Sequence, residues 1–183
     1  MSNLIDLALN PPRSSKKRGI RLDITRRDPT KPFVWPLLAL GSREPTVVHE
    51  HHADRKGVDL GYEPEHYDRE LFVPVYAAND GEIAVAIESP MGNAISIDHG
   101  TWSTHYTGLS KLFVVPCLPR WRGRERVRRG HVIGYAAKSP IRIGFELWRW
   151  TGAKGFVAVD ALESLKSWKH APASLGSSVN EAA

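Results

Sequence analysis

The sequence predicts a mainly β fold, an antiparallel β barrel or sandwich with one short helix near the C-terminus. Between residues 71 and 106, short apolar runs alternate with turn signals of the Asp-Gly and Gly-Asn kind, at 79–81 and 90–93. Such spacing is typical of small antiparallel barrels and sandwiches. The stretch 140–150 then alternates apolar and polar residues strictly, as expected for a strand with one buried face.

The individual elements follow from the same period-two pattern. Strands are expected, in chain order, at 19–25, 57–61, 72–76, 83–87, 94–98, 102–106, 132–136 and 141–150. The helix is expected from Asp160 to about Lys169, because Asp160 and Glu163 have the spacing of a capping box. Its Leu162, Leu165 and Trp168 are expected to pack on the sheet.

The chain is expected to divide into three parts. Residues 1–32 form a basic N-terminal arm, 33–170 form the β domain, and 171–183 form a flexible tail, because both ends are too polar to build a core. The total of 183 residues suffices for one domain with such appendages.

Composition limits the classes of function. The single cysteine, Cys117, excludes an intramolecular disulfide and a cysteine-rich zinc site. No apolar run reaches about 18 residues, so no membrane span is expected. The first 19 residues lack the order of a secretory signal, so we expect synthesis in the cytoplasm without a signal peptide. The net charge of +5 suits an acidic partner or ordinary solubility equally well.

The polar face of the 140–150 strand is the first candidate site. This face combines charged, small and aromatic residues, as expected for the floor of a binding groove. Its residues are the cation Arg142, Gly144, the carboxylate Glu146 and the indoles Trp148 and Trp150. The alternative is that the two indoles pack against Trp168 and the helix.

Two other clusters invite a functional interpretation. Arginines interleaved with an aromatic residue could grip phosphates, at Arg120, Arg122, Arg124, Arg126, Arg128 and Arg129. The alternative, an exposed and solubilising hairpin tip, is favoured. Three histidines within four residues, at 49–52, suggest a metal, but a solvated loop is the favoured interpretation.

Several fragments together resemble a known family. In order they read GVDLGY, VPVYAANDGEIAVA, GNAISIDHG, THYTGL, VRRGHVIGYAA and RIGFELW. The order and spacing are similar to those of the LytM/lysostaphin-type zinc endopeptidases, metallopeptidase family 23, across about residues 55–160. The resemblance implies their duplicated-hybrid-motif β fold, which in that family cuts peptide cross-links of peptidoglycan.

The resemblance also shows which site residues are missing. The positions of the family's zinc ligands hold Arg55, Asp59 and Gly144, of which only Asp59 offers a lone pair. The general-base position holds Arg142, and the position of a further active-site histidine holds Gly108. Guanidinium and glycine cannot bind zinc, which needs about three protein ligands. The resemblance therefore implies a degenerate member, with no cofactor and no catalytic residues expected.

From these substitutions we expect Arg142, together with Arg55, to pair with Asp59 where the metal would lie. The neighbouring face, with Tyr106, is then expected to bind peptidoglycan or a protein in an envelope or virion assembly, such as a phage tail or a conjugation or secretion machine. His105 is expected to point away from it. Two alternatives stay open: an active zinc endopeptidase using His51, His52 and Asp59, and a nucleic-acid-binding module using the arginine cluster.

Overall fold

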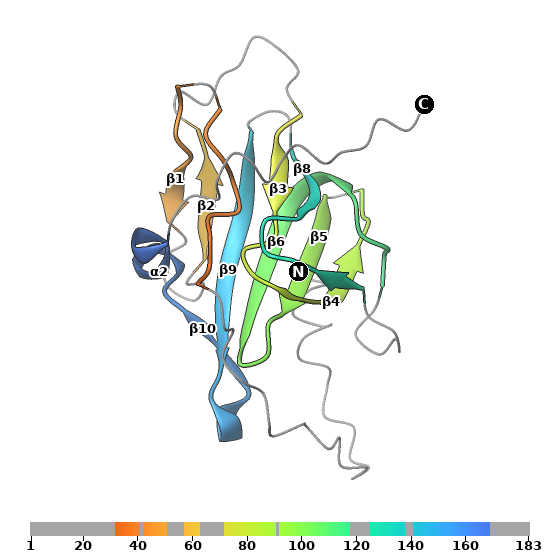
Figure 1. The fold of residues 1–183 in the computed structure, drawn as a ribbon, viewed down its shortest axis with the longest axis vertical. Helices are drawn as coiled ribbons and strands as arrows, with labels where there is room; N and C mark the ends of the chain where they lie inside the picture. Colours follow the sequence, from red (N-terminus) through yellow and green to blue (C-terminus); the bar gives the residue numbers. More distant parts are fainter. Residues whose placement is uncertain are drawn as a thin grey trace.

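The computed structural model describes residues 32–40, 42–50, 57–62, 72–90, 92–117, 125–137 and 141–168. Within these ranges ten strands form one antiparallel sheet with the order β1-β2-β9-β6-β5-β4-β7 (Figure 1). Strand β10 extends the pairing of β9, and β3 joins the sheet through β8, which pairs with β6. The predicted mainly β, antiparallel fold with one short helix is confirmed.

The elements have the following bounds. The strands are β1 (Thr46–Glu50), β2 (Val58–Gly61), β3 (Pro74–Tyr76), β4 (Gly81–Ile87), β5 (Asn93–Asp98), β6 (Trp102–Leu112), β7 (Arg126–Val127), β8 (Val132–Ala136), β9 (Arg142–Trp150) and β10 (Phe156–Val159). A 3-10 turn, η1 (Gly152–Lys154), links β9 to β10, and α2 (Ala161–Ser167) follows.

Strand β9 lies at the centre and has the two faces that its sequence predicts. Ile143, Phe145 and Leu147 are buried, whereas the residues between them are only half-buried. β9 pairs with β6 along one edge and with β2 and then β10 along the other. Its polar side chains therefore share one face with those of β2 and β6.

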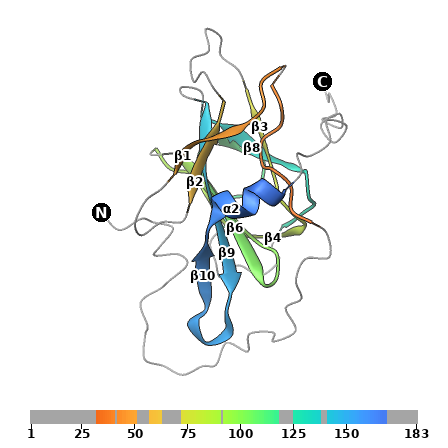
Figure 2. The same ribbon diagram turned by 90° about the vertical axis from the view of Figure 1, so that its left-hand side faces the viewer.

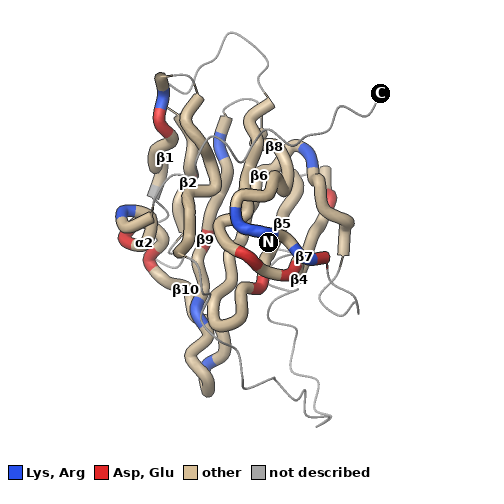
Figure 3. The backbone as a smooth tube through the Cα atoms, viewed as in Figure 1, with Lys and Arg blue, Asp and Glu red and all other residues tan. Residues whose placement is uncertain are grey.

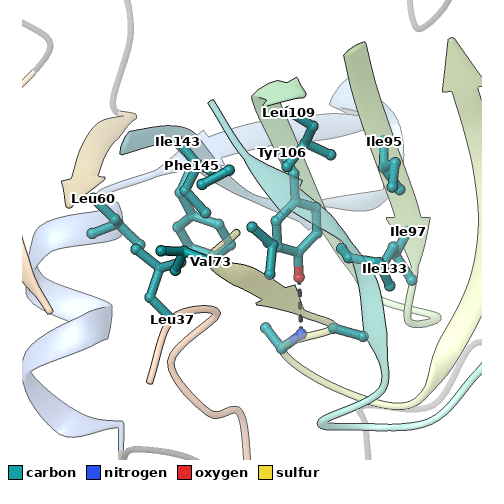
Figure 4. Close-up of a cluster of buried hydrophobic side chains, with 14 of the residues drawn as sticks. Leu37, Leu60, Val73, Ile95, Ile97, Tyr106, Leu109, Ile133, Ile143 and Phe145 are labelled. Atoms are coloured by element: carbon teal, nitrogen blue, oxygen red, sulfur yellow. Dashed lines mark hydrogen bonds between the residues drawn. The ribbon is translucent and has the colours of Figure 1, made fainter. Parts of the chain in front are cut away.

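The hydrophobic core lies on the opposite face of the sheet. Strands β3 and β8 and the segment around Leu37 cover this face, so that Val73 and Ile133 meet Phe145 and Tyr106 in one cluster (Figure 4). Period-two alternation places these side chains together, because every second residue of each strand points inward. The core thus fixes which face of β2, β6 and β9 remains available for a site.

Helix α2 closes one edge of the core (Figure 2). The Asp160 carboxylate accepts a hydrogen bond from Glu163 N at 3.1 Å, which confirms the predicted cap. Leu165 is buried, and Trp168 packs edge-on against Phe145 with ring centroids 5.8 Å apart. The helix ends at Ser167, slightly before the predicted end.

Gly108 marks the point where β6 changes partners. Up to Thr107, β6 pairs with β9, and from Leu109 it pairs with β8. The change is accompanied by a φ of +71° at Gly108, a left-handed conformation that favours glycine. The glycine at this position thus has a structural reason of its own.

Three strands were not predicted: β1, β7 and β10. His49 is predicted from the sequence to lie in a solvated loop, but Thr46–Glu50 is a strand, because its β-branched residues pair with the edge of β2. The proposed strand at 19–25, the arm up to residue 31 and the tail lie outside the described residues. In the part that is described, no helix has the length and apolar run needed to cross a membrane.

Candidate functional site

The candidate site is the face of β2, β9 and β6 that points away from the core, here called the polar face. Strand register puts its residues in rows: Asp59 lies opposite Gly144, and Gly144 opposite Thr107. One row further along, Glu146 lies opposite His105. Directly opposed residues share a face, so these side chains are neighbours.

Arg142 and Asp59 form the contact that the sequence analysis expected. Arg142 Nη1 lies 3.9 Å from Asp59 Oδ2, with the side chains 37% and 19% exposed. A guanidinium carries five donors and no lone pair, so it neutralises a carboxylate but cannot ligate a metal. In the described structure, the cation beside Asp59 is therefore a side chain. Arg55, the other expected partner, lies outside the described residues.

Thr107 fills the space next to Gly144. A Cβ added to Gly144 would collide with Thr107 Oγ1, while Asp59 Oδ1 would lie 3.6 Å away. A histidine could therefore enter this position only if Thr107 changed its rotamer. Thr107 thus occupies the space that a side chain at position 144 would need.

The described residues do not fit a zinc ion at this site. Zinc takes about three lone-pair ligands plus water, and only Asp59 offers one among the family positions. Across the described ranges, no group of three or more His, Cys, Asp or Glu side chains is arranged to hold a metal. His51 and His52, the alternative ligands, lie outside those ranges.

His105 was expected to point away from the site, and this expectation was wrong. Its ring stacks on Trp148 with centroids 5.4 Å apart and an interplanar angle of 16°. Nδ1 lies 3.9 Å from Glu146 Oε2, and Trp148 Nε1 donates to the same oxygen at 3.0 Å. Burial lowers the pKa of His105 to about 4, with His99 adding to the shift, so the imidazole is neutral at pH 7.

The wrong prediction for His105 followed from the face that was assigned to Tyr106. Tyr106 is predicted from the sequence to lie on the groove face, but its side chain is fully buried in the core, where the hydroxyl accepts a hydrogen bond from Ala78 N at 2.9 Å (Figure 4). Alternate residues of a strand point to opposite faces, so His105 takes the polar face instead. Burial raises the pKa of Tyr106 to about 12.

Known structures share this arrangement of strands. No known family profile matches the sequence, and no curated protein sequence matches it. The structure is similar to a chain of the crystal structure of the SpoIIIAH and SpoIIQ complex, with a TM-score of 0.53 and 21% identity over 72% of this chain and 98% of that one. A chain of the SpoIIQ-SpoIIIAH pore-forming complex gives a TM-score of 0.53 and 19% identity over 82% and 99%.

The solution structure of lysostaphin matches with a TM-score of 0.50 and 20% identity, over 72% of this chain and 53% of the lysostaphin chain. The chain has a lysostaphin-like fold. The chain spans about half the length of that lysostaphin chain. At such identities the similarity establishes the fold, whereas function depends on the residues of the site.

The two indoles of this lysostaphin-like domain have partners on their own face. Trp148 stacks on His105, and Trp150 packs edge-on against Phe156 with centroids 5.3 Å apart. Trp168 instead contacts Phe145 from the core side. The alternative that Trp148 and Trp150 pack against Trp168 therefore finds no ring contact in the described part of the chain.

His49 is a further residue of the polar face that the sequence analysis did not assign to the site. It is the register partner of Asp59 across β1 and β2, and it is exposed. An extended row therefore runs from His49 through Asp59 and Gly144 to Thr107. Recognising β1 as a strand would have been enough to find it.

The described part of the arginine cluster is engaged in local contacts. Arg126 Nε lies 3.3 Å from Glu82 Oε1, and acidic and basic residues lie side by side near β4 and β7 (Figure 3). Arg129 donates from Nη1 to Pro32 O and from its backbone N to Asp80. Arg128 is exposed, whereas Arg120, Arg122 and Arg124 lie outside the described residues.

Proposed function

We propose that this chain is a catalytically inactive LytM-like domain that uses its polar face to bind peptidoglycan. The observation that carries the proposal is the 3.9 Å contact between Arg142 and Asp59, because it puts a fixed cation beside the one remaining ligand position. Without a metal there is no activated water at this site to attack a peptide bond. The half-buried Glu146, Trp148 and Trp150 remain available for contacts to peptide and sugar.

The test is an assay of binding and cleavage on the same material. Purified peptidoglycan sacculi are mixed with the protein, sedimented and analysed for bound protein and for released fragments. The proposal expects sedimentation with the sacculi and no fragments. Cleavage that Asp59→Ala abolishes would instead establish the zinc endopeptidase alternative. Loss of sedimentation in Trp148→Ala, with Val157→Ala as the exposed control on β10, would locate binding on the polar face.

A second candidate function is a scaffold for a protein partner in an envelope or virion assembly, such as a phage tail or a conjugation or secretion machine. It is favoured by an exposed aromatic cluster at β8, in which the ring of Tyr135 contacts those of Phe72 and Phe113, with centroids 5.4 Å and 4.7 Å apart. Phe72 and Phe113 are 58% and 42% exposed. Two of the similar structures are of SpoIIQ in complex with SpoIIIAH. Aromatic residues at exposed positions are enriched in protein interfaces.

The two candidates are separated by different substitutions. Phe72→Ser together with Phe113→Ser would abolish capture of a protein partner from a host envelope extract and leave sedimentation with sacculi unchanged. The nucleic-acid alternative predicts binding that weakens steeply with salt. Absence of DNA and RNA binding at low salt would remove it.

A further inference from the structure

His105 and Glu146 face each other across β6 and β9, and among the described residues no hydrogen-bond donor lies between them. Ser103 Oγ lies 3.0 Å from Ile97 O, a pure acceptor, so the single hydroxyl hydrogen is used there. His105 Nε2 lies 3.1 Å from Ser103 Oγ. Because this hydroxyl has no second hydrogen to donate, Nε2 must be the donor of the hydrogen bond between them. The neutral ring is therefore the Nε2–H tautomer, and Nδ1 presents a lone pair.

This Nδ1 is a buried acceptor without a partner. Among the described residues no group donates to it, and the His105 side chain is 97% buried, given a side-chain exposure of 3%. The nearest charged atom is Glu146 Oε2 at 3.9 Å, which is also an acceptor. One donor atom placed between them, about 2.8–3.0 Å from each, would satisfy both.

The charge of Glu146 narrows the choice of donor. In the described structure its carboxylate has one hydrogen bond, from Trp148 Nε1, and no Lys or Arg forms an ion pair with it. The side chain is 27% exposed, so the charge is partly desolvated. A partly buried carboxylate is stabilised most by a cationic donor. The indole of Trp148 beside the site adds the attraction of an aromatic ring for a cation.

We infer that His105 Nδ1 and Glu146 Oε2 together bind a protonated primary amine. A water molecule could bridge the two acceptors but would leave the charge uncompensated. A metal ion would need a third ligand, and the described residues provide none. A guanidinium spreads its N–H groups over a planar fork, whereas an ammonium is a compact donor with three hydrogens on one atom.

The inference rests on the proposed function and adds the chemical group that is recognised. If the ligand is a wall peptide, the group is a free amino group of a peptide side chain. Asp59 does not compete for it, because its carboxylate contacts Arg142. The amine site thus lies one row along the polar face from the Arg142–Asp59 pair.

The test is a titration of the full-length protein with methylammonium chloride, followed by ¹⁵N NMR of the His105 ring and the Trp148 indole. Sodium chloride and methanol serve as matched probes for ionic strength and for a neutral donor. Methylammonium alone is expected to give saturable shifts. Glu146→Gln is expected to weaken binding by about tenfold or more, because a charge-assisted hydrogen bond is lost. Glu163→Gln, an exposed carboxylate on α2, is expected to change nothing.

His105→Phe is the second variant: it keeps a ring to stack on Trp148, removes the Nδ1 acceptor together with the Nε2 donor to Ser103, and is expected to weaken methylammonium binding as well. Equal shifts with methanol or sodium chloride, or unchanged affinity in Glu146→Gln, would overturn the inference. The wild-type comparison of the three probes decides the question even if a variant fails to fold. Methylammonium binding without sedimentation on sacculi would contradict the proposed function alone, and sedimentation without methylammonium binding would contradict the amine site alone.

Discussion

Arg142 and Asp59 are diagonal neighbours on adjacent strands, two residues out of direct register. Asp59 lies opposite Gly144, and Arg142 lies opposite Gly61. The Arg142 side chain therefore leans along β2 to bring Nη1 within 3.9 Å of the carboxylate. The pair closes the position on which, by resemblance to the family, a metal site would be centred.

The first prediction concerns the strength of this pair. Arg142 is 37% exposed, so solvent screens the interaction. A double-mutant cycle with Arg142→Ala and Asp59→Ala, measured by urea unfolding, is expected to give a coupling free energy of about 0.2–1 kcal/mol. A coupling near zero would mean that the two charges do not interact in solution.

The second prediction concerns the space beside Gly144. Gly144→Ala forces the Thr107 hydroxyl out of its place and is expected to lower the free energy of unfolding by about 1 kcal/mol or more. The double variant Gly144→Ala/Thr107→Ala is expected to recover part of this loss, because the colliding oxygen is absent. If the single variant were as stable as the wild type, Thr107 would not occupy the ligand position.

The third prediction concerns the buried hydroxyl of Tyr106. Tyr106→Phe leaves Ala78 N without its acceptor inside the core, and should cost about 1–3 kcal/mol in the free energy of unfolding. Tyr135→Phe, on the half-exposed aromatic cluster, is the matched control and should stay within about 0.5 kcal/mol of the wild type. Equal effects of the two substitutions would place Tyr106 outside the core.

The fourth prediction is a dependence of stability on pH. In the unfolded chain a histidine takes up its proton near pH 6.5, whereas burial lowers the pKa of His105 to about 4 in the folded protein. The neutral form is therefore favoured by folding, and its stabilisation is complete above pH 6.5 and is lost as the pH falls from 6.5 towards 4. His99, whose pKa burial also lowers, contributes in the same direction.

Between pH 7 and pH 5 the wild type is expected to lose about 2 kcal/mol more stability than His105→Gln, which cannot titrate. Urea unfolding at the two pH values measures the difference. Parallel losses in the two proteins would show that His105 is not buried as described.

The sequence predicted most of the sheet because its signals are local. The turns at 79–81 and 90–93 and the alternation along β9 set the faces of neighbouring strands without reference to tertiary structure. The strand β1 was not predicted because its three β-branched residues are followed by polar ones, and so short a run becomes a strand only when the edge of β2 is present to pair with it.

The candidate site was predicted in part, and the wrong assignments, of Tyr106 and His105, both concern the face of β6. Arg142, Asp59 and Glu146 share a face, as their spacing within strands implied. Tyr106 was assigned to the polar face because it is two residues from Gly108, and alternate residues of a regular strand share a face. However, β6 changes partners at Gly108, where φ is +71°, so the alternation does not continue through this residue. The role of His105 depends on this irregularity, which no spacing rule reveals.

We propose that the Arg142 guanidinium lies, within this lysostaphin-like fold, where a metal ion would otherwise be held beside Asp59. Zinc content of the full-length protein, purified in the presence of zinc and then dialysed, tests it most directly. Zinc is expected at well below one ion per chain, and Asp59→Ala is expected to leave this content unchanged. One tightly held zinc per chain that is lost in Asp59→Ala would contradict it.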